Sequence, residues 1–203
     1  QDQLESNCAV QLRTPKIVQN LPSVLNYEQL LQLLKASSTS RFEYRDVAII
    51  EVLYSCGLRV AELVGLDVSD VDLSEGFLKV VGKGGKTRHT PLGGSAQKAI
   101  IKYLETHQAS ALFINKNGDR IGVRSIQNMI KKRALLAGIK VNVYPHMLRH
   151  AAATHFLQSS HDLRSTQEFL GHASIKSTQV YTHLDFLELS KVYDKCHPRA
   201  KKT

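Results

Sequence analysis

The side chains best suited to chemistry lie in the stretch PHMLRHAAATHF. His146 and Arg149 are three positions apart, so a helix would place them on one face. Leu148, Ala152 and Phe156 form a separate apolar stripe that we expect to face the core. Alanines around Arg149 leave room for its guanidinium and keep carboxylates away, and such a guanidinium can grip a phosphate with two parallel hydrogen bonds. An ordinary surface arginine is the alternative interpretation.

The same helix has two histidines at the spacing of a zinc-binding helix. His146 and His150 are four residues apart, but Met147 stands where the hydrolytic zinc motif has its glutamate base. Arg149 would also repel a bound cation. We therefore expect no metal site here.

A glycine-rich stretch, GKGGKT, has part of the pattern of a nucleotide-binding loop. Gly85, Lys86 and Thr87 fit its last three positions, but its first glycine would fall on Val80. The stretch also runs into TRHTPLGG, a poor helix start, whereas phosphate-binding loops lead into a helix. The flanking segments GFLKVV and TRHTP instead predict a β-hairpin. We expect no ATP binding, and the hairpin alone leaves the role of its lysines open.

Two further stretches carry polar side chains next to glycine turns. In CGLRVAELVGL, Arg59 follows a turn, and Glu62 could hold it by an ion pair or merely form a surface pair. In FLGHASIKSTQVYTH, Gly171 ends one helix and His172 lies in the turn. Tyr181 follows nine residues later on the next helix. A lone helical tyrosine usually packs in a core.

The composition points to a polyanionic partner. The 203 residues are 42% hydrophobic and carry a formal net charge of +9, with an isoelectric point near 9.5. No apolar run approaches the roughly 18 residues that span a membrane. Cys8, Cys56 and Cys196 are scattered without a C-x-x-C pair, which favours reduced thiols in the cytoplasm.

The chain is expected to be mostly helical, of the α+β class, with one small antiparallel sheet. Residues 1–25 lack periodicity and carry Pro15 and Pro22, as in an arm or interdomain linker. Asn26, with Gln29, predicts a capping box for the first helix. Besides the hairpin we expect a short strand at 111–115, a basic tail at 197–203, and helices at 27–37, 41–57, 59–66, 95–107 (capped by Ser95), 123–138, 146–158, 162–171, 174–184 and 186–196.

The order of these motifs resembles the tyrosine site-specific recombinases of the phage-integrase family. The chain contains, in this order, G-L-R, a lysine in a glycine-rich hairpin, H-x-x-R-H, L-G-H and a tyrosine nine residues on. The resemblance covers residues 20–200 and is strongest to the bacterial Xer recombinases. The ending VYDKCHPRAKK favours the XerC type over its partner XerD. The resemblance to the family implies a catalytic domain at 26–203, without the N-terminal core-binding domain of the family.

The resemblance implies metal- and ATP-independent DNA strand breakage and rejoining through a 3′-phosphotyrosine link. Arg59 and Arg149 would grip the scissile phosphate, and Glu62 would orient Arg59. The remaining catalytic assignments are Tyr181 as nucleophile, Lys83 as proton donor to the 5′-oxygen, His146 in proton transfer and His172 as a hydrogen-bond donor to the phosphate. Contacts to the DNA backbone are expected from Lys86, Arg88, Arg124, Lys131, Lys132 and Arg133, with a solvated helix face as the alternative.

The resemblance also implies partners. These are double-stranded DNA with a dif-like recombination site, a XerD-type recombinase in a tetramer, and a septal DNA translocase of the FtsK type, in chromosome dimer resolution. The helix from Phe186 to Cys196 resembles the segment that docks into a neighbouring recombinase. His161 and Met147 depart from the usual family residues. A phage or mobile-element integrase and a non-enzymatic DNA-binding module are the alternatives.

Overall fold

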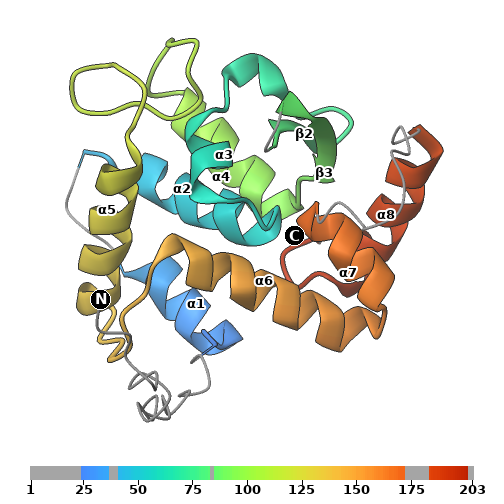
Figure 1. The fold of residues 1–203 in the computed structure, drawn as a ribbon. Helices are drawn as coiled ribbons and strands as arrows, with labels where there is room; N and C mark the ends of the chain where they lie inside the picture. Colours follow the sequence, from blue (N-terminus) through green and yellow to red (C-terminus); the bar gives the residue numbers. More distant parts are fainter. Residues whose placement is uncertain (1–23, 37–40, 83–84, 172–182, 201–203) are drawn as a thin grey trace, which may run out of the picture.

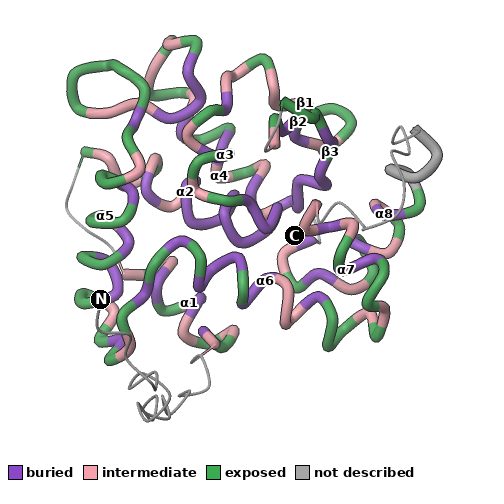
Figure 2. Tube along the Cα trace, in the orientation of Figure 1, coloured by how far each residue is buried: buried purple, intermediate pink, exposed green. Residues whose placement is uncertain are grey.

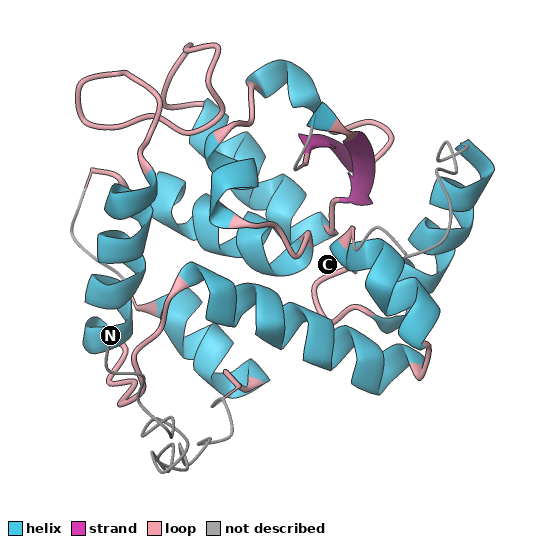
Figure 3. Cartoon of the chain, in the orientation of Figure 1, coloured by secondary structure: helices cyan, strands magenta, loops and turns pink. Residues whose placement is uncertain are grey.

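The computed structural model describes residues 24–36, 41–82, 85–171 and 183–200, with the backbone alone at 183–187. Within these ranges the chain forms eight α-helices, one 3-10 turn and one antiparallel sheet (Figures 1 and 3). The mostly helical α+β class is confirmed. In chain order the elements are α1 (Tyr27–Lys35), α2 (Glu43–Ser55), α3 (Val60–Val64), the 3-10 turn (Val68–Asp70), β1 (Val71–Asp72), β2 (Phe77–Val81), β3 (Thr87–Pro91), α4 (Gly94–Leu104), α5 (Val123–Leu136), α6 (Pro145–Ser160), α7 (Leu163–Leu170) and α8 (His183–Cys196).

Helix α2 forms the centre of the core. Every residue from Ala48 to Ser55 is buried, so the helix has no solvent-facing side over this stretch (Figure 2). Helices α1, α3, α4, α5 and α6 all contact it. The chain that leaves the C-terminal end of α2 therefore starts from a fixed position, and that segment carries Arg59.

The small sheet has the order β1-β2-β3, with β2 and β3 as the predicted hairpin. Leu78 and Val80 are buried on β2, and Arg88 and Thr90 are buried opposite them on β3. Alternate residues thus face inward, as expected for a sheet with one covered face. Arg88 lies on that inner face opposite Val80, where a charged group needs a partner.

Two details of the predicted elements are corrected by the structure. Residues 111–115 form no strand but only isolated bridges, and the third strand of the sheet is Val71–Asp72. Helix α4 is not capped by Ser95, because it begins at Gly94 with Gly93 at the N-cap. The capping box of Asn26 and Gln29 is confirmed. Most of the helix expected at 174–184 lies outside the described residues.

The segment after α8 is not a free basic tail over residues 197–200. His197 and Ala200 are buried, and the chain returns toward α2 and α6 (Figure 1). Arg199 donates to both carboxylate oxygens of Glu51 on α2. The ring of His197 stacks on Tyr193 of α8 at 4.5 Å between centroids. Helix α8 itself contacts α6, α7 and β3 of its own chain; docking into a neighbouring molecule stays a prediction.

Burial of His197 gives the stability of the protein a pH dependence. Burial lowers the pKa of His197 to about 3, whereas an unfolded histidine titrates near 6.5. Below about pH 6.5 the unfolded chain gains a proton that the folded chain excludes, so stability is lost as the pH falls toward 3. His197→Phe removes this proton uptake and keeps a ring against Tyr193.

As the pH falls from about 6 to about 4, the free energy of unfolding should decrease less steeply for His197→Phe than for the unaltered protein. We expect the two slopes to differ by about 1.4 kcal/mol per pH unit. Urea unfolding at several pH values measures both slopes. His150→Gln, at an exposed position of α6, is the control and should keep the original slope. Equal slopes for His197→Phe and the unaltered protein would contradict the prediction.

Candidate functional site

Arg59 is positioned by the sharp turn that ends α2. Gly57 adopts φ +57°, and a Cβ there would lie 2.9 Å from the ring of Phe169. Only glycine fits this left-handed, closely packed position without strain. Two residues later Arg59 caps α3, with its backbone N–H donating to Glu62 Oε2 at 2.8 Å. Its guanidinium is about half exposed and donates to Glu62 Oε1 at 3.0 Å.

Glu62 is the centre of the charged cluster, with a side chain only 5% exposed. Arg88 binds it with both terminal nitrogens, Nη1 to Oε1 and Nη2 to Oε2, each at 2.9 Å. Arg149 Nη1 lies 3.9 Å from Oε2. Burial alone would raise the pKa of Glu62, but hydrogen bonds from Arg88 and from Arg59 lower it to about 2. One carboxylate thus faces three guanidinium groups, which leaves the cluster positively charged.

Arg149 is buried on α6, and two backbone carbonyls hold it. Nη1 donates to the carbonyl of Gly57, and Nη2 donates to that of Leu170 at 2.7 Å. Burial, followed by the charge of Arg59, lowers the pKa of Arg149 to about 10, so it stays protonated at neutral pH. The expectation that no carboxylate lies near Arg149 is wrong, because Glu62 does. The apolar stripe predicted beside it on α6 is confirmed as core.

His146 lies exposed on the first turn of α6, one turn before Arg149. The structure therefore brings Arg59, Glu62 and Arg149 together in one charged cluster and leaves His146 exposed on the same helix as Arg149. Lys83, His172 and Tyr181 lie outside the described residues. Their described neighbours, Gly82 and Gly171, are both next to Arg88, since an added Cβ on either would contact its side chain.

The expected phosphate contact of Arg133 is corrected by its burial. The side chain is 3% exposed and holds Glu43 in a two-bond ion pair at 2.7 and 2.9 Å. Its Nε and Nη2 also donate to the carbonyls of Leu33 and Leu34 at the end of α1. Arg133 therefore joins α5 to α1 and α2. A sequence signal was available, since Arg133 is three residues after Ile130 and falls on the apolar face of α5.

The expected phosphate contact of Arg88 is corrected for the same reason. Its guanidinium is buried, and both terminal nitrogens bind the carboxylate of Glu62, so its charge is compensated inside the protein instead of facing solvent. The other predicted contacts, which are exposed and so remain predictions, are Lys86 before β3 and Arg124, Lys131 and Lys132 on α5.

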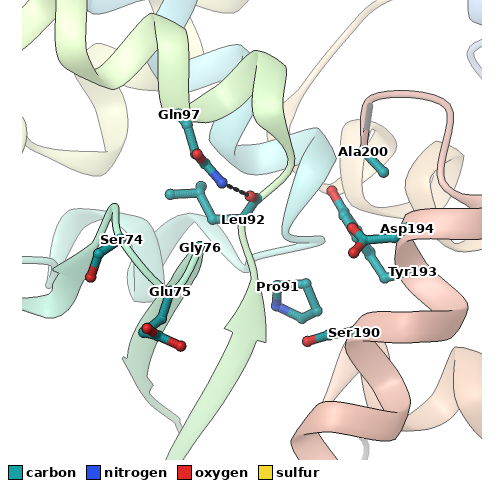
Figure 4. A pocket seen from close by; sticks show the side chains of 10 residues that line it. All are labelled: Ser74, Glu75, Gly76, Pro91, Leu92, Gln97, Ser190, Tyr193, Asp194 and Ala200. Carbon is teal, nitrogen blue, oxygen red and sulfur yellow. Dashed lines mark hydrogen bonds between the residues drawn. The ribbon is translucent and has the colours of Figure 1, made fainter. Parts of the chain in front are cut away.

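A pocket of about 460 Å³ lies elsewhere, between the β1–β2 turn, the end of β3, α4 and α8 (Figure 4). Gln97 donates to the carbonyl of Leu92 at its edge, at 2.7 Å. Its lining holds Glu75 and Asp194 but no lysine, arginine or histidine, so it does not suit a phosphate. The lining residues are Ser74, Glu75, Gly76, Pro91, Leu92, Gln97, Ser190, Tyr193, Asp194 and Ala200.

Among the described residues, no group of three or more histidine, cysteine, aspartate or glutamate side chains could hold a metal ion. None of the described helices combines the length and apolar composition needed to cross a bilayer.

Comparison with known proteins gives consistent matches. The phage integrase family matches residues 23–188. Proteins called tyrosine recombinase XerC from Alcanivorax borkumensis and Actinobacillus pleuropneumoniae are 46% and 43% identical over 97% and 100% of this chain. The chain spans 67% and 68% of their lengths, about two thirds.

Several solved recombinase and integrase structures are also similar to this chain. A XerA recombinase is 36% identical with a TM-score of 0.70, covering 94% of this chain and 71% of that one. XerH bound to its palindromic difH substrate is 28% identical with a TM-score of 0.67, covering 86% and 53%. The integrase of mycobacterium phage Brujita is 26% identical with a TM-score of 0.76, covering 98% and 66%.

The ion-pair cluster around Glu62 makes a prediction about stability. Glu62→Gln should lower the free energy of unfolding by about 3–5 kcal/mol near pH 7, because Arg88 stays buried without its counter-charge. Since the folded pKa of Glu62 is about 2, its contribution is complete above the unfolded value near 4.5 and is lost as the pH falls through 2. The difference between variant and unaltered protein should therefore shrink toward acid pH.

Urea unfolding at neutral and acid pH measures this difference. Glu168→Gln breaks an exposed ion pair with Arg164 and should change stability by less than about 1 kcal/mol. A Glu62→Gln protein as stable as the Glu168→Gln control would show that the cluster does not hold the fold together.

Proposed function

The chain belongs to the phage integrase family, the tyrosine recombinases, and we propose that it cuts and rejoins double-stranded DNA with Tyr181 as the nucleophile. The observation that carries the proposal is the arrangement of Arg59 and Arg149 around Glu62. It provides two guanidinium groups, one half exposed and one fixed by carbonyls, at a cluster with excess positive charge. Such a cluster suits a phosphodiester, which is an anion that gains charge during the reaction.

In the proposed first step, the phenol oxygen of Tyr181 attacks the phosphorus, and the bond from phosphorus to the 5′-oxygen breaks. A 3′-phosphotyrosine link forms, and the 5′-oxygen leaves as a hydroxyl. The phenol has a reference pKa near 10, so it must lose its proton as it attacks. We assign proton transfer near the nucleophile to His146 and protonation of the 5′-oxygen to Lys83. Attack by a 5′-hydroxyl on the phosphotyrosine reverses the step and reseals DNA.

Arg59, Arg149 and His172 are assigned to the non-bridging oxygens of the phosphate. Arg149 is well prepared for this because the carbonyls of Gly57 and Leu170 fix its guanidinium before DNA arrives. Donors that need no rearrangement during the reaction stabilise its transition state most effectively. Glu62 orients Arg59 by accepting two hydrogen bonds from it.

For the biological role we propose chromosome dimer resolution. The identity to proteins called tyrosine recombinase XerC exceeds 40%, whereas the phage Brujita integrase is 26% identical; this favours a Xer role over a phage integrase. XerH has been solved bound to a difH substrate, which supports double-stranded DNA with a dif-like site as the partner here. We further propose that the protein is cytoplasmic and that it acts in a tetramer with a XerD-type recombinase, together with an FtsK-type translocase. Residues 26–203 would form the catalytic domain.

The central test is covalent attachment to DNA. Incubated with a nicked duplex that carries a dif-like site, a XerD-type partner and EDTA, the protein should form an adduct that survives a denaturing gel. Tyr181→Phe should lose the adduct completely and keep its DNA affinity within about twofold, because only the nucleophilic oxygen is removed. Tyr44→Phe, at an exposed tyrosine of α2, should form the adduct normally. A collapse of DNA affinity in Tyr181→Phe would mean that the tyrosine is structural.

The exposed lysines of α5 make a separate prediction. If Lys131 and Lys132 contact phosphates, each change to glutamine should reduce the slope of log affinity against log salt by about 0.9, whatever the DNA sequence. Binding titrations at several salt concentrations measure the slope. Lys98→Gln removes the same charge from an exposed position of α4. Equal effects at all three lysines would indicate general attraction rather than contacts made by α5.

A further inference from the structure

Arg88 has no assigned part in the reaction, yet it makes the strongest contact to the residue that orients Arg59. Its two terminal nitrogens bind the two oxygens of Glu62 in parallel, both at 2.9 Å. Such bidentate pairs fix direction as well as distance, because both groups are planar. Arg59 uses the same two oxygens, through its backbone N–H and through Nη1. Any movement of the Arg88 guanidinium therefore moves the carboxylate that holds Arg59.

The side chain of Arg88 is closely surrounded by backbone at two glycines. A methyl group added to Gly171 would lie 2.5 Å from Arg88 Nε and 2.7 Å from its Cδ, so the backbone of the α7 turn lies directly against the side chain. A methyl group on Gly82 would lie 3.4 Å from Nη1. The side chain thus lies against the turn after α7 and close to Gly82, and no described residue accepts a hydrogen bond from its Nε.

These contacts join separate parts of the chain. Arg88 belongs to β3, and Glu62 belongs to α3, 26 residues earlier. Gly171 lies immediately before His172, and Gly82 immediately before Lys83. Arg149 holds the same turn through the carbonyl of Leu170, so two buried arginines contact adjacent residues of it.

We propose that Arg88 is a positioning residue of the recombination reaction, which fixes Glu62 and through it the guanidinium of Arg59 at the scissile phosphate. The inference rests on the proposed function, since it assigns a role to Arg59. Arg88 touches neither DNA nor the reacting atoms in this role. A misplacement of about 1 Å in a group at the reacting centre can lower a rate on the order of 100-fold, so a positioning role has a measurable size.

Arg133 offers a matched control for the loss of a buried ion pair. It too is buried and binds a carboxylate, that of Glu43, with two hydrogen bonds, but it joins α5 to α1 and α2. Arg88→Met and Arg133→Met should therefore both lower the thermal unfolding temperature. Only Arg88→Met should slow the single-turnover formation of the covalent adduct, by roughly 10- to 100-fold, with DNA affinity nearly unchanged. The rate is measured well below the unfolding temperature of each variant.

Two further variants test the route through Glu62. Arg88→Lys keeps the charge but not the parallel pair, so it should fold more stably than Arg88→Met and recover only part of the rate. The double variant Arg88→Met with Glu62→Gln should be no slower than the slower single variant, because both changes remove one interaction. If the two rate losses multiply, Arg88 does not act through Glu62 and the proposal is overturned. Equal rates for Arg88→Met and Arg133→Met would also overturn it.

Failure of the proposed function would look different. If the unaltered protein forms no adduct with its partner recombinase present, or if the adduct persists in Tyr181→Phe, the recombinase mechanism itself is wrong. If the unaltered protein reacts and Tyr181→Phe does not, the rates of the Arg88 variants decide the positioning role alone.

Discussion

The structure depends on one buried carboxylate that is shared among guanidinium groups from three separate parts of the chain. Glu62 comes from α3, Arg59 from the turn before it, Arg88 from β3 and Arg149 from α6. A buried carboxylate without counter-charges would be strongly destabilising, and so would buried arginines without a carboxylate. The charges that form the candidate site therefore also fix the position of the sheet relative to the helical core.

The cluster also explains how a positively charged site can exist before a phosphate arrives. Arg88 and Glu62 compensate each other through a parallel pair, while Arg149 is compensated mainly by two carbonyl dipoles and by the more distant Glu62. Carbonyls stabilise a guanidinium without cancelling its charge. Arg59 stays half exposed, so water can solvate it. The excess charge is thus kept close to the surface, where a DNA backbone could use it.

Local signals in the sequence predicted the parts of the fold that depend on neighbouring residues. The capping box at Asn26, the hairpin and the apolar stripe of α6 follow from spacing alone. The roles of Arg88 and Arg133 do not, because a basic side chain looks the same in sequence whether it meets water or a distant carboxylate. Glu43 lies 90 residues from Arg133. The basic composition of the segment after α8 predicts a basic tail, whereas Arg199 is paired with Glu51.

That last pair relates the fold to the order in which the chain is made. Glu51 and Arg199 are separated by 148 residues, so α2 is synthesised long before the segment that covers its end. Contacts between such distant residues form late, because a long loop must close first. Arg199 also follows Tyr181, the proposed nucleophile, so the segment that covers Glu51 is synthesised after every residue assigned to the reaction. A chain that ends just before Arg199 would contain every residue assigned to the reaction but would lack the ion pair that covers Glu51 on α2.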